Sequence, residues 1–258
     1  MNRILKLILY YFAYQLGFSV LAWVISVFFM PMDAVEMTSY TMVVSTLAMT
    51  WHLIHFGYVS ITQDRYKTMS MVTWAVSVIF VYAATFVLNV VIEQMSIPNT
   101  MEDTFIAMAN NVFGLLSIAL LAPVLEELLF RGAIEGELLR QGYKPWIAIL
   151  LSSLIFGVVH LNPAQIPFAF LIGMMFGWLY YRTGSLLPGI VGHILNNSVA
   201  AYNMIQYGNA TIEEQLSSTN AMWQWTILAI VVFVVATVWL NRDMVDKETD
   251  SIYNRGEK

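Results

Sequence analysis

The stretch that decides the fold class runs from Ser70 to Ile92 and reads SMVTWAVSVIFVYAATFVLNVVI. It contains no charged side chain, and a bilayer span needs about 20 mostly apolar residues. Seven further stretches show the same character, at about 7–30, 39–60, 104–125, 145–161, 164–182, 185–205 and 223–240. The sequence therefore predicts an all-α polytopic membrane protein, with about eight transmembrane helices forming one bundle.

Composition supports a protein whose solvent is a lipid bilayer. Of the 258 residues, 59% are hydrophobic and only 11% are charged, whereas a soluble domain carries about 25% charged residues. The absence of cysteine excludes disulfides and thiolate catalysis. The net charge of −5, without a basic run, gives no indication of nucleic-acid binding.

Cationic residues predict the orientation in the membrane, because cytoplasmic loops carry an excess of Lys and Arg. With eight spans, the cations of the loops and tails all fall on one side: Arg3, Lys6, Arg65, Lys67, Arg140, Lys144, Arg182, Arg242, Lys247, Arg255 and Lys258. The opposite loops hold only acids: Asp33, Glu36, Glu93, Glu102, Asp103, Glu213 and Glu214. We expect an integral protein of a prokaryotic plasma (inner) membrane, with both termini cytoplasmic and the first span kept as an uncleaved anchor.

Ionisable residues inside the apolar half of the chain are costly and therefore indicate function. The first group is Glu126-Glu127-Leu-Leu-Phe-Arg131. On a helix, Glu127 and Arg131 are i,i+4 neighbours and can pair, while Glu126 points elsewhere. Glu126 could then serve as a general base for water, although a structural Glu–Arg pair at a helix end explains the same residues.

Two further groups have i,i+4 spacing. Phe156 and His160 share a helix face, so the ring could wall a site while the imidazole orients a water. His193 and Asn197 also share a face and could donate to a developing oxyanion, with Asn196 an alternative amide. Packed histidines and interhelical polar clasps are the structural alternatives.

Together these motifs resemble the CAAX prenyl protease and bacteriocin-processing family of intramembrane endopeptidases. That family is also described as CAAX prenyl protease 2-like or lysostaphin-resistance-protein-A-like. The order Glu-Glu-x-x-x-Arg, Phe-x-x-x-His, His-x-x-x-Asn is complete, and the resemblance covers about residues 110–205. We therefore expect N-terminal helices over 1–100, a catalytic core over 101–205, and an outer loop, last helix and cytoplasmic tail over 206–258.

The resemblance implies a role for each motif residue. Glu126 would activate the attacking water with help from His160, and His193 with Asn197 would stabilise the oxyanion. Glu127 and Arg131 would support the first motif, and Phe156 would shape the pocket. The expected partners are a peptide or protein substrate and the bilayer. The resemblance implies a metal-free mechanism with no cofactor, although two Glu and two His could in principle bind zinc.

Other patterns have structural explanations. His52 and His55 lie at i,i+3 in the second span, where polar packing is favoured over a role in the site. Gly173 and Gly177 indicate close helix packing, and Pro163 and Pro167 should separate two helices. Two other functions use the same buried polar groups: a transporter with a proton or ion relay, and a scaffold or immunity protein that binds a partner.

Overall fold

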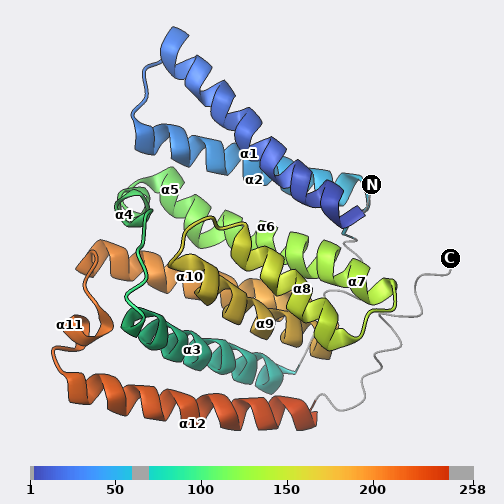
Figure 1. Cartoon of the computed structure of the whole chain (residues 1–258), viewed down its shortest axis with the longest axis vertical. Coiled ribbons are helices and arrows are strands. Elements are labelled where there is room, and N and C mark those ends of the chain that lie inside the picture. The colour runs from blue at the N-terminus through green and yellow to red at the C-terminus, as the bar shows by residue number, and fades with distance from the viewer. Residues whose placement is uncertain (1–2, 60–69, 244–258) are drawn as a thin grey trace. The chain divides into compact units, whose positions relative to one another are not determined.

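The computed structural model describes residues 3–59 and 70–243, and every regular element in these residues is a helix (Figure 1). The predicted all-α fold class is confirmed. Among the described residues, four helical stretches are long and apolar enough to cross a membrane: Arg3–Phe28, Met71–Gln94, Val112–Arg140 and Thr219–Arg242. The molecule is thus an integral membrane protein by composition and helix length, while the count of eight spans stays a prediction.

The chain divides into two compact units, each assembled from separate parts of the sequence. The first unit contains residues 1–60, 101–134 and 193–208, and the second contains 61–100, 135–192 and 209–258. Two elements pass from one unit into the other: η3 (Glu127–Glu135), and α10 (Leu187–Tyr207), which enters the first unit at His193.

The first unit begins with α1 (Arg3–Phe28) and α2 (Ala34–His55), which pack side by side as a hairpin (Figure 1). A capping box starts α2, because Asp33 accepts from the Glu36 amide at 2.8 Å while Glu36 accepts from the Asp33 amide at 3.1 Å. At the other end of the hairpin, the Arg3 guanidinium lies over the Tyr58 ring and reaches the Gly57 carbonyl.

The fourth predicted span is wrong in its start and its end. A helix break falls inside it, because α4 (Glu102–Ala109) ends before Asn110 and Asn111 caps a new helix through its side chain. From there α5 (Val112–Leu116), η2 (Ser117–Leu121), α6 (Ala122–Glu126), η3 and α7 (Gly136–Arg140) follow without interruption. Two of these segments, η2 and η3, are π-helical. Helix therefore continues past Arg131.

In the second unit, α3 (Met71–Gln94) packs against both α9 (Gln165–Thr183) and α12 (Thr219–Asp243). Phe80 lies at the centre, with its ring 5.4 Å from Trp178 of α9 and 5.1 Å from Phe233 of α12. Ser70 caps the start of α3 by accepting from the Thr73 amide. These aromatic contacts join three helices that are far apart in the sequence.

A close helical hairpin is formed by α8 (Pro145–Val158) and α9. It requires glycine at two points. A Cβ on Gly157 would lie 2.9 Å from the Ile166 carbonyl oxygen, and one on Gly177 would lie 2.6 Å from a carboxylate oxygen of buried Glu135. The predicted role of Gly177 in close packing is confirmed. Pro163 lies in the turn between the two helices and Pro167 lies in the first turn of α9, as predicted.

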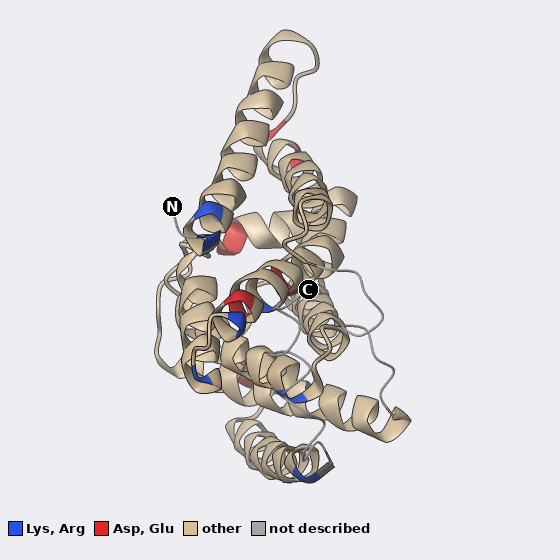
Figure 2. Cartoon of the chain, turned by 90° about the vertical axis from the view of Figure 1, so that its right-hand side faces the viewer, with Lys and Arg blue, Asp and Glu red and all other residues tan. Residues whose placement is uncertain are grey.

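Charged side chains are sparse on the helices (Figure 2). Arg182 donates to the Asn241 carbonyl at the end of α12, whereas Glu93 accepts from the Ile212 amide at the start of α11 (Ile212–Leu216). The two contacts lie at different helix ends of this unit, while the orientation predicted from the loop charges stays a prediction. Arg65, Lys67, Lys247, Arg255 and Lys258 lie outside the described residues.

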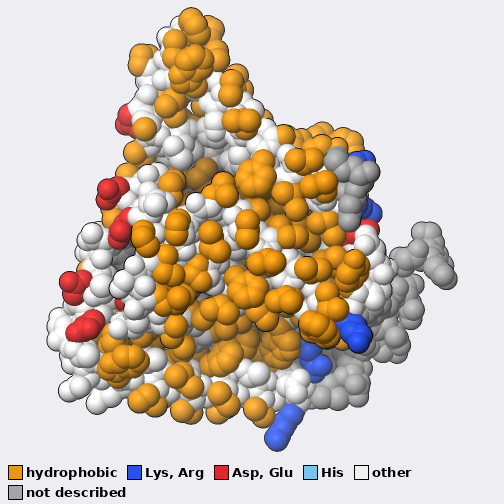
Figure 3. All heavy atoms as spheres, in the orientation of Figure 1, with side chains coloured by type: hydrophobic (Ala, Val, Ile, Leu, Met, Phe, Trp, Pro, Cys, Tyr) orange, Lys and Arg blue, Asp and Glu red, His pale blue; other side chains and the backbone are white. Residues whose placement is uncertain are grey.

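Hydrophobic side chains cover much of the face visible in Figure 3. Trp23 on α1 and Ile227 on α12 are among the exposed large apolar residues. Soluble monomers rarely expose apolar patches above a few hundred Å². An apolar surface of this kind suits hydrocarbon rather than water, in agreement with a bilayer environment.

Candidate active site

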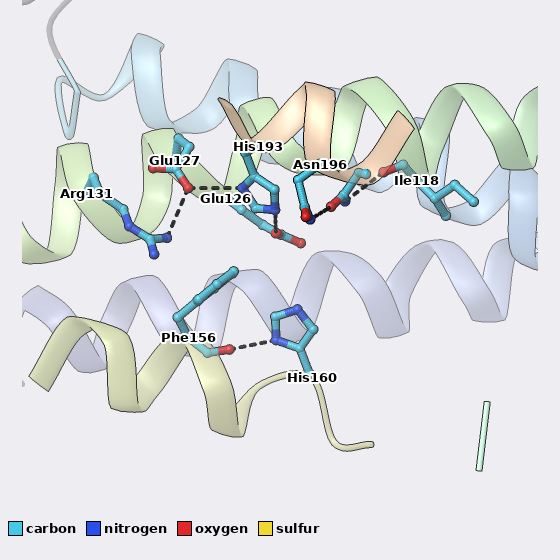
Figure 4. A network of polar contacts seen from close by, with 9 residues as sticks. Ile118, Glu126, Glu127, Arg131, Phe156, His160, His193 and Asn196 are labelled. Carbon is cyan, nitrogen blue, oxygen red and sulfur yellow. Dashed lines mark hydrogen bonds and ion pairs between the residues drawn. The ribbon is translucent and has the colours of Figure 1, made fainter. Parts of the chain in front are cut away.

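In the first unit, the two glutamates of the first motif flank one imidazole from α10 (Figure 4). The Glu127 Oε1 atom lies 3.0 Å from His193 Nδ1, and the Glu126 Oε2 atom lies 3.5 Å from His193 Nε2. Consecutive helical residues point about 100° apart, so a single side chain can touch both only from a neighbouring helix. The structure thus brings together Glu126, Glu127 and His193.

The two carboxylates differ in burial. Glu127 is 1% exposed and forms an ion pair with Arg131, with 3.2 Å between Oε1 and Nη1. Arg131 is also 1% exposed, so this pair is shielded from water. Glu126 is 14% exposed. Glu126 is therefore the carboxylate that a water or substrate can reach, while Glu127 is held between Arg131 and His193.

Charges in this cluster can balance. An ionised carboxylate only accepts hydrogen bonds, so both contacts are attractive when His193 carries a proton on each ring nitrogen. Two anions, Glu126 and Glu127, would then face two cations, Arg131 and His193. Buried charges are tolerated only when they are paired in this way.

Asn197 of the third motif binds a backbone carbonyl that lacks a donor within its own helical segment. In η2 the Ala122 amide donates to the Ser117 carbonyl, five residues back. The next donor in this register would be residue 123, which is proline and has no N–H. The Ile118 carbonyl instead accepts from Asn197 Nδ2 at 2.9 Å. Pro123 therefore explains why this α10 side chain is bound here.

Asn196 and Asn197 form one amide pair. Asn196 Nδ2 donates to Asn197 Oδ1 at 2.9 Å, which fixes the orientation of the Asn197 amide (Figure 4). The Asn197 carbonyl oxygen is thus used by its neighbour, and one of its two N–H groups is used by Ile118. Its second N–H is the group that could donate a hydrogen bond to a substrate.

Phe156 and His160 belong to the second unit. Their rings meet edge to face with 4.8 Å between centroids, as the i,i+4 spacing predicted. His160 Nδ1 lies 2.7 Å from the Phe156 carbonyl oxygen. A carbonyl can only accept, so Nδ1 carries the proton, and Nε2 of the neutral ring is left as an acceptor.

His52 packs among aromatic rings. Its Nδ1 lies 3.1 Å from the Tyr14 hydroxyl, and the rings of Tyr10, Tyr14, Phe56 and Tyr58 lie within 5.7 Å of its own. His55 stacks on Trp51 at 4.6 Å. The predicted packing between helices is confirmed for His52, whose partners Tyr10 and Tyr14 lie in α1, whereas His55 contacts Trp51 and Phe56 of its own segment.

Tyr11 was not predicted from the sequence. It lies in α1, with its ring 6.5 Å from that of Phe130 in η3. The sequence offered only a weak signal, because Tyr10, Tyr11 and Tyr14 are three of many aromatic residues in an apolar helix. Contact with the motif exists only once α1 has packed.

The donors of the first unit do not fit a metal site. Both nitrogens of His193 face carboxylates, and Glu127 is engaged by Arg131. Within residues 3–59 and 70–243, no three His, Asp or Glu side chains gather as ligands. A catalytic zinc needs about three protein ligands and an open position.

Comparisons with known proteins concern the segment that holds these motifs. The chain is 30% identical over 97 residues to "Putative membrane peptidase YdiL" of Bacillus subtilis, covering 38% of this chain and 39% of that protein. It is 36% identical over 110 residues to the "Membrane-embedded CAAX protease MroQ" of Staphylococcus aureus, covering 41% and 44%. The chain thus matches less than half the length of either relative.

No solved structure matches the chain. A family model does, and it covers residues 108–199. This range contains Glu126, Glu127, Arg131, Phe156, His160, His193 and Asn197. The resemblance seen in the sequence is therefore confirmed over this segment, which matches the family described as type II CAAX prenyl endopeptidase, Rce1-like.

Proposed function

We propose that this protein is an intramembrane endopeptidase that hydrolyses a peptide bond with a water activated by Glu126. The observation that carries the proposal is the imidazole of His193 between an accessible and an inaccessible carboxylate. A structural ion pair would need only Glu127 and Arg131. The second carboxylate, partly open to solvent, is the extra group that hydrolysis requires.

In the proposed reaction, Glu126 takes a proton from water as the oxygen attacks the carbonyl carbon. The negative charge that develops on the carbonyl oxygen is stabilised by His193 Nε2–H and by the second N–H of Asn197. The C–N bond then breaks, and the proton held by Glu126 passes to the leaving amine. Glu127 and Arg131 hold His193 in place throughout.

His160 has an assisting role in this proposal. Its Nε2 acceptor suits it to orient the attacking water or to share its proton, and Phe156 would shape the pocket beside it. No cofactor is needed. The substrate is a peptide or protein, and the enzyme acts in a prokaryotic plasma membrane with both termini in the cytoplasm.

The experiment is cleavage of a peptide library by purified protein in lipid vesicles. Glu126→Gln should lower the rate by about 10²–10⁴-fold, the usual contribution of a general base. Glu102→Gln, which changes a glutamate in the first turn of α4, is the matched control. Equal cleavage by wild type and Glu126→Gln would remove this residue from the mechanism.

The same vesicles separate the proposal from its rivals. A transporter would show ion or proton flux without cleavage. A scaffold or immunity protein would keep its cellular effect in the Glu126→Gln variant. Combining Glu126→Gln with His160→Gln tests the assisting role, because residues that act on one water give strongly non-additive losses.

A further inference from the structure

The turn that follows His160 has an unusual hydrogen-bond pattern. At the end of α8, the amides of His160 and Leu161 donate three residues back, to Gly157 at 3.3 Å and Val158 at 3.2 Å. An α-helical bond would instead have joined the His160 amide to the Phe156 carbonyl. This tightening releases the Phe156 carbonyl, which the His160 ring then uses through Nδ1.

Leu161 occupies a conformation that leucine rarely adopts. Its φ is +55°, in the left-handed region where glycine is favoured. Its side chain is 70% exposed, so burial of the leucine does not compensate for the backbone. Such residues persist only where the surrounding structure determines them. Some other contact must therefore hold the turn.

Asn162 provides that contact. It is fully buried, and its Oδ1 accepts from the Thr100 amide at 3.2 Å and from the Thr100 hydroxyl at 3.4 Å. Its Nδ2 donates to Asn99 Oδ1 at 2.8 Å. Its backbone carbonyl accepts from the first amides of α9, those of Gln165 and Ile166. A single side chain thus joins the turn to the segment before α4.

We propose that Asn162 is a positioning residue for His160. Its hydrogen bonds to Asn99 and Thr100 hold Leu161 in the left-handed conformation and keep the imidazole as the Nδ1-protonated tautomer. Nε2 is thereby kept as an acceptor. The catalytic use of this acceptor rests on the proposed function, since an assisting base needs an acceptor in a fixed position. The tautomer of His160 itself can be measured without any substrate.

The test is nitrogen NMR of protein labelled with ¹⁵N in its histidines. The four histidines, at positions 52, 55, 160 and 193, are assigned from single His→Gln variants. In the wild type we expect the His160 signals of one tautomer, with a proton on Nδ1. In Asn162→Ala we expect signals averaged between tautomers, while His193, held by Glu127, serves as the internal control.

Two variants separate positioning from a general loss of structure. Asn162→Asp keeps the acceptor for Thr100, and a turned Asn99 amide can donate to it, so the single tautomer should return. Adding Leu161→Gly to Asn162→Ala removes the backbone conflict at the turn, so the tautomer should be partly restored. A general loss of structure would instead change the His193 signals as well.

An unchanged His160 tautomer in Asn162→Ala would overturn the proposal. Loss of the single tautomer to the same extent in Asn162→Ala and Asn162→Asp would also overturn it. If Asn162→Ala does not fold, Asn99→Ala removes one bond of the same clasp and is judged in the same way. Where the library is cleaved, Asn162→Ala should lower kcat by about 10- to 100-fold, as small misplacements do. A wild type that cleaves nothing defeats the proposed function, while the tautomer experiment still decides this inference.

Discussion

His193 and His160 are oriented by different kinds of contact. His193 is 6% exposed, and its Nδ1 is held by Glu127, a side chain that lies 66 positions away in the sequence. His160 is half-buried, and its Nδ1 is held by a carbonyl of its own helix, four residues back. The first ring depends on a buried ion cluster, and the second on the backbone of one turn.

The two histidines show that an imidazole can be oriented by contacts whose loss costs very different amounts of stability. A buried charge cluster is strongly destabilised when one partner is removed, because the other charge stays desolvated. A local backbone contact is inexpensive to form but also weak, so it needs support from its surroundings. Breaking long-range contacts should therefore have large effects, and breaking local contacts should have small ones.

The largest expected effect is that of Arg131→Met. Glu127 would keep its burial but lose its cation, and the protein should lose about 3–5 kcal/mol of unfolding free energy. Chemical denaturation in detergent micelles measures this loss. The control is Arg140→Met, which breaks the more exposed pair with Glu137 and should cost within about 1 kcal/mol. Similar losses in the two variants would mean that burial does not distinguish these pairs.

An intermediate effect is expected for the amide of the first unit. Asn197→Ala leaves the Ile118 carbonyl without its donor, which should cost about 1–3 kcal/mol. Pro123→Ala supplies a backbone N–H in the register that proline leaves empty.

A double-mutant cycle on denaturation free energies tests this explanation. In the Pro123→Ala background, Asn197→Ala should cost clearly less than it does in the wild type. Additive losses would show that Pro123 is not the reason why Asn197 binds the Ile118 carbonyl.

The smallest effect is expected for a purely local contact at the start of α11. The Thr211 amide and hydroxyl donate to Glu214 at 2.7 and 3.0 Å and lower the pKa of this carboxyl. A lowered folded pKa contributes stability above the unfolded value of 4.5, and this contribution is lost as pH falls through the folded pKa.

Hydrogen exchange of the Glu214 amide, which donates to Thr211 Oγ1, measures this cap. Protection should decrease on acidification below pH 4.5 in the wild type. Glu214→Gln should show no such change beyond the intrinsic effect of pH on exchange. Loss of protection elsewhere in α10 or α12 would contradict a local role.

Much of the fold could be predicted from hydrophobic runs alone. The break at Asn110 could not, because Asn111 reads as one more polar residue until its side chain is seen to cap a helix. The π-helical segments η2 and η3 were also unpredicted, since i→i+5 bonding leaves hydrophobic periodicity almost unchanged over five to nine residues.

For the site, i,i+4 spacing predicted each pair within a helix: Glu127 with Arg131, and Phe156 with His160. It could not say that His193 lies between both glutamates, nor that Asn197 binds Ile118. The contacts of Tyr11 and Asn162 were missed because each depends on a partner from another helix or loop.

The sequence by itself determined the all-helical class, the bilayer as solvent and the residues of three motifs, because these depend on composition and on the fixed geometry of a helix. Only the tertiary structure decided which glutamate is shielded, which nitrogen of His160 carries a proton and which carbonyl lacks a backbone donor. Those properties depend on the burial and hydrogen bonds that arise when segments far apart in the chain pack together.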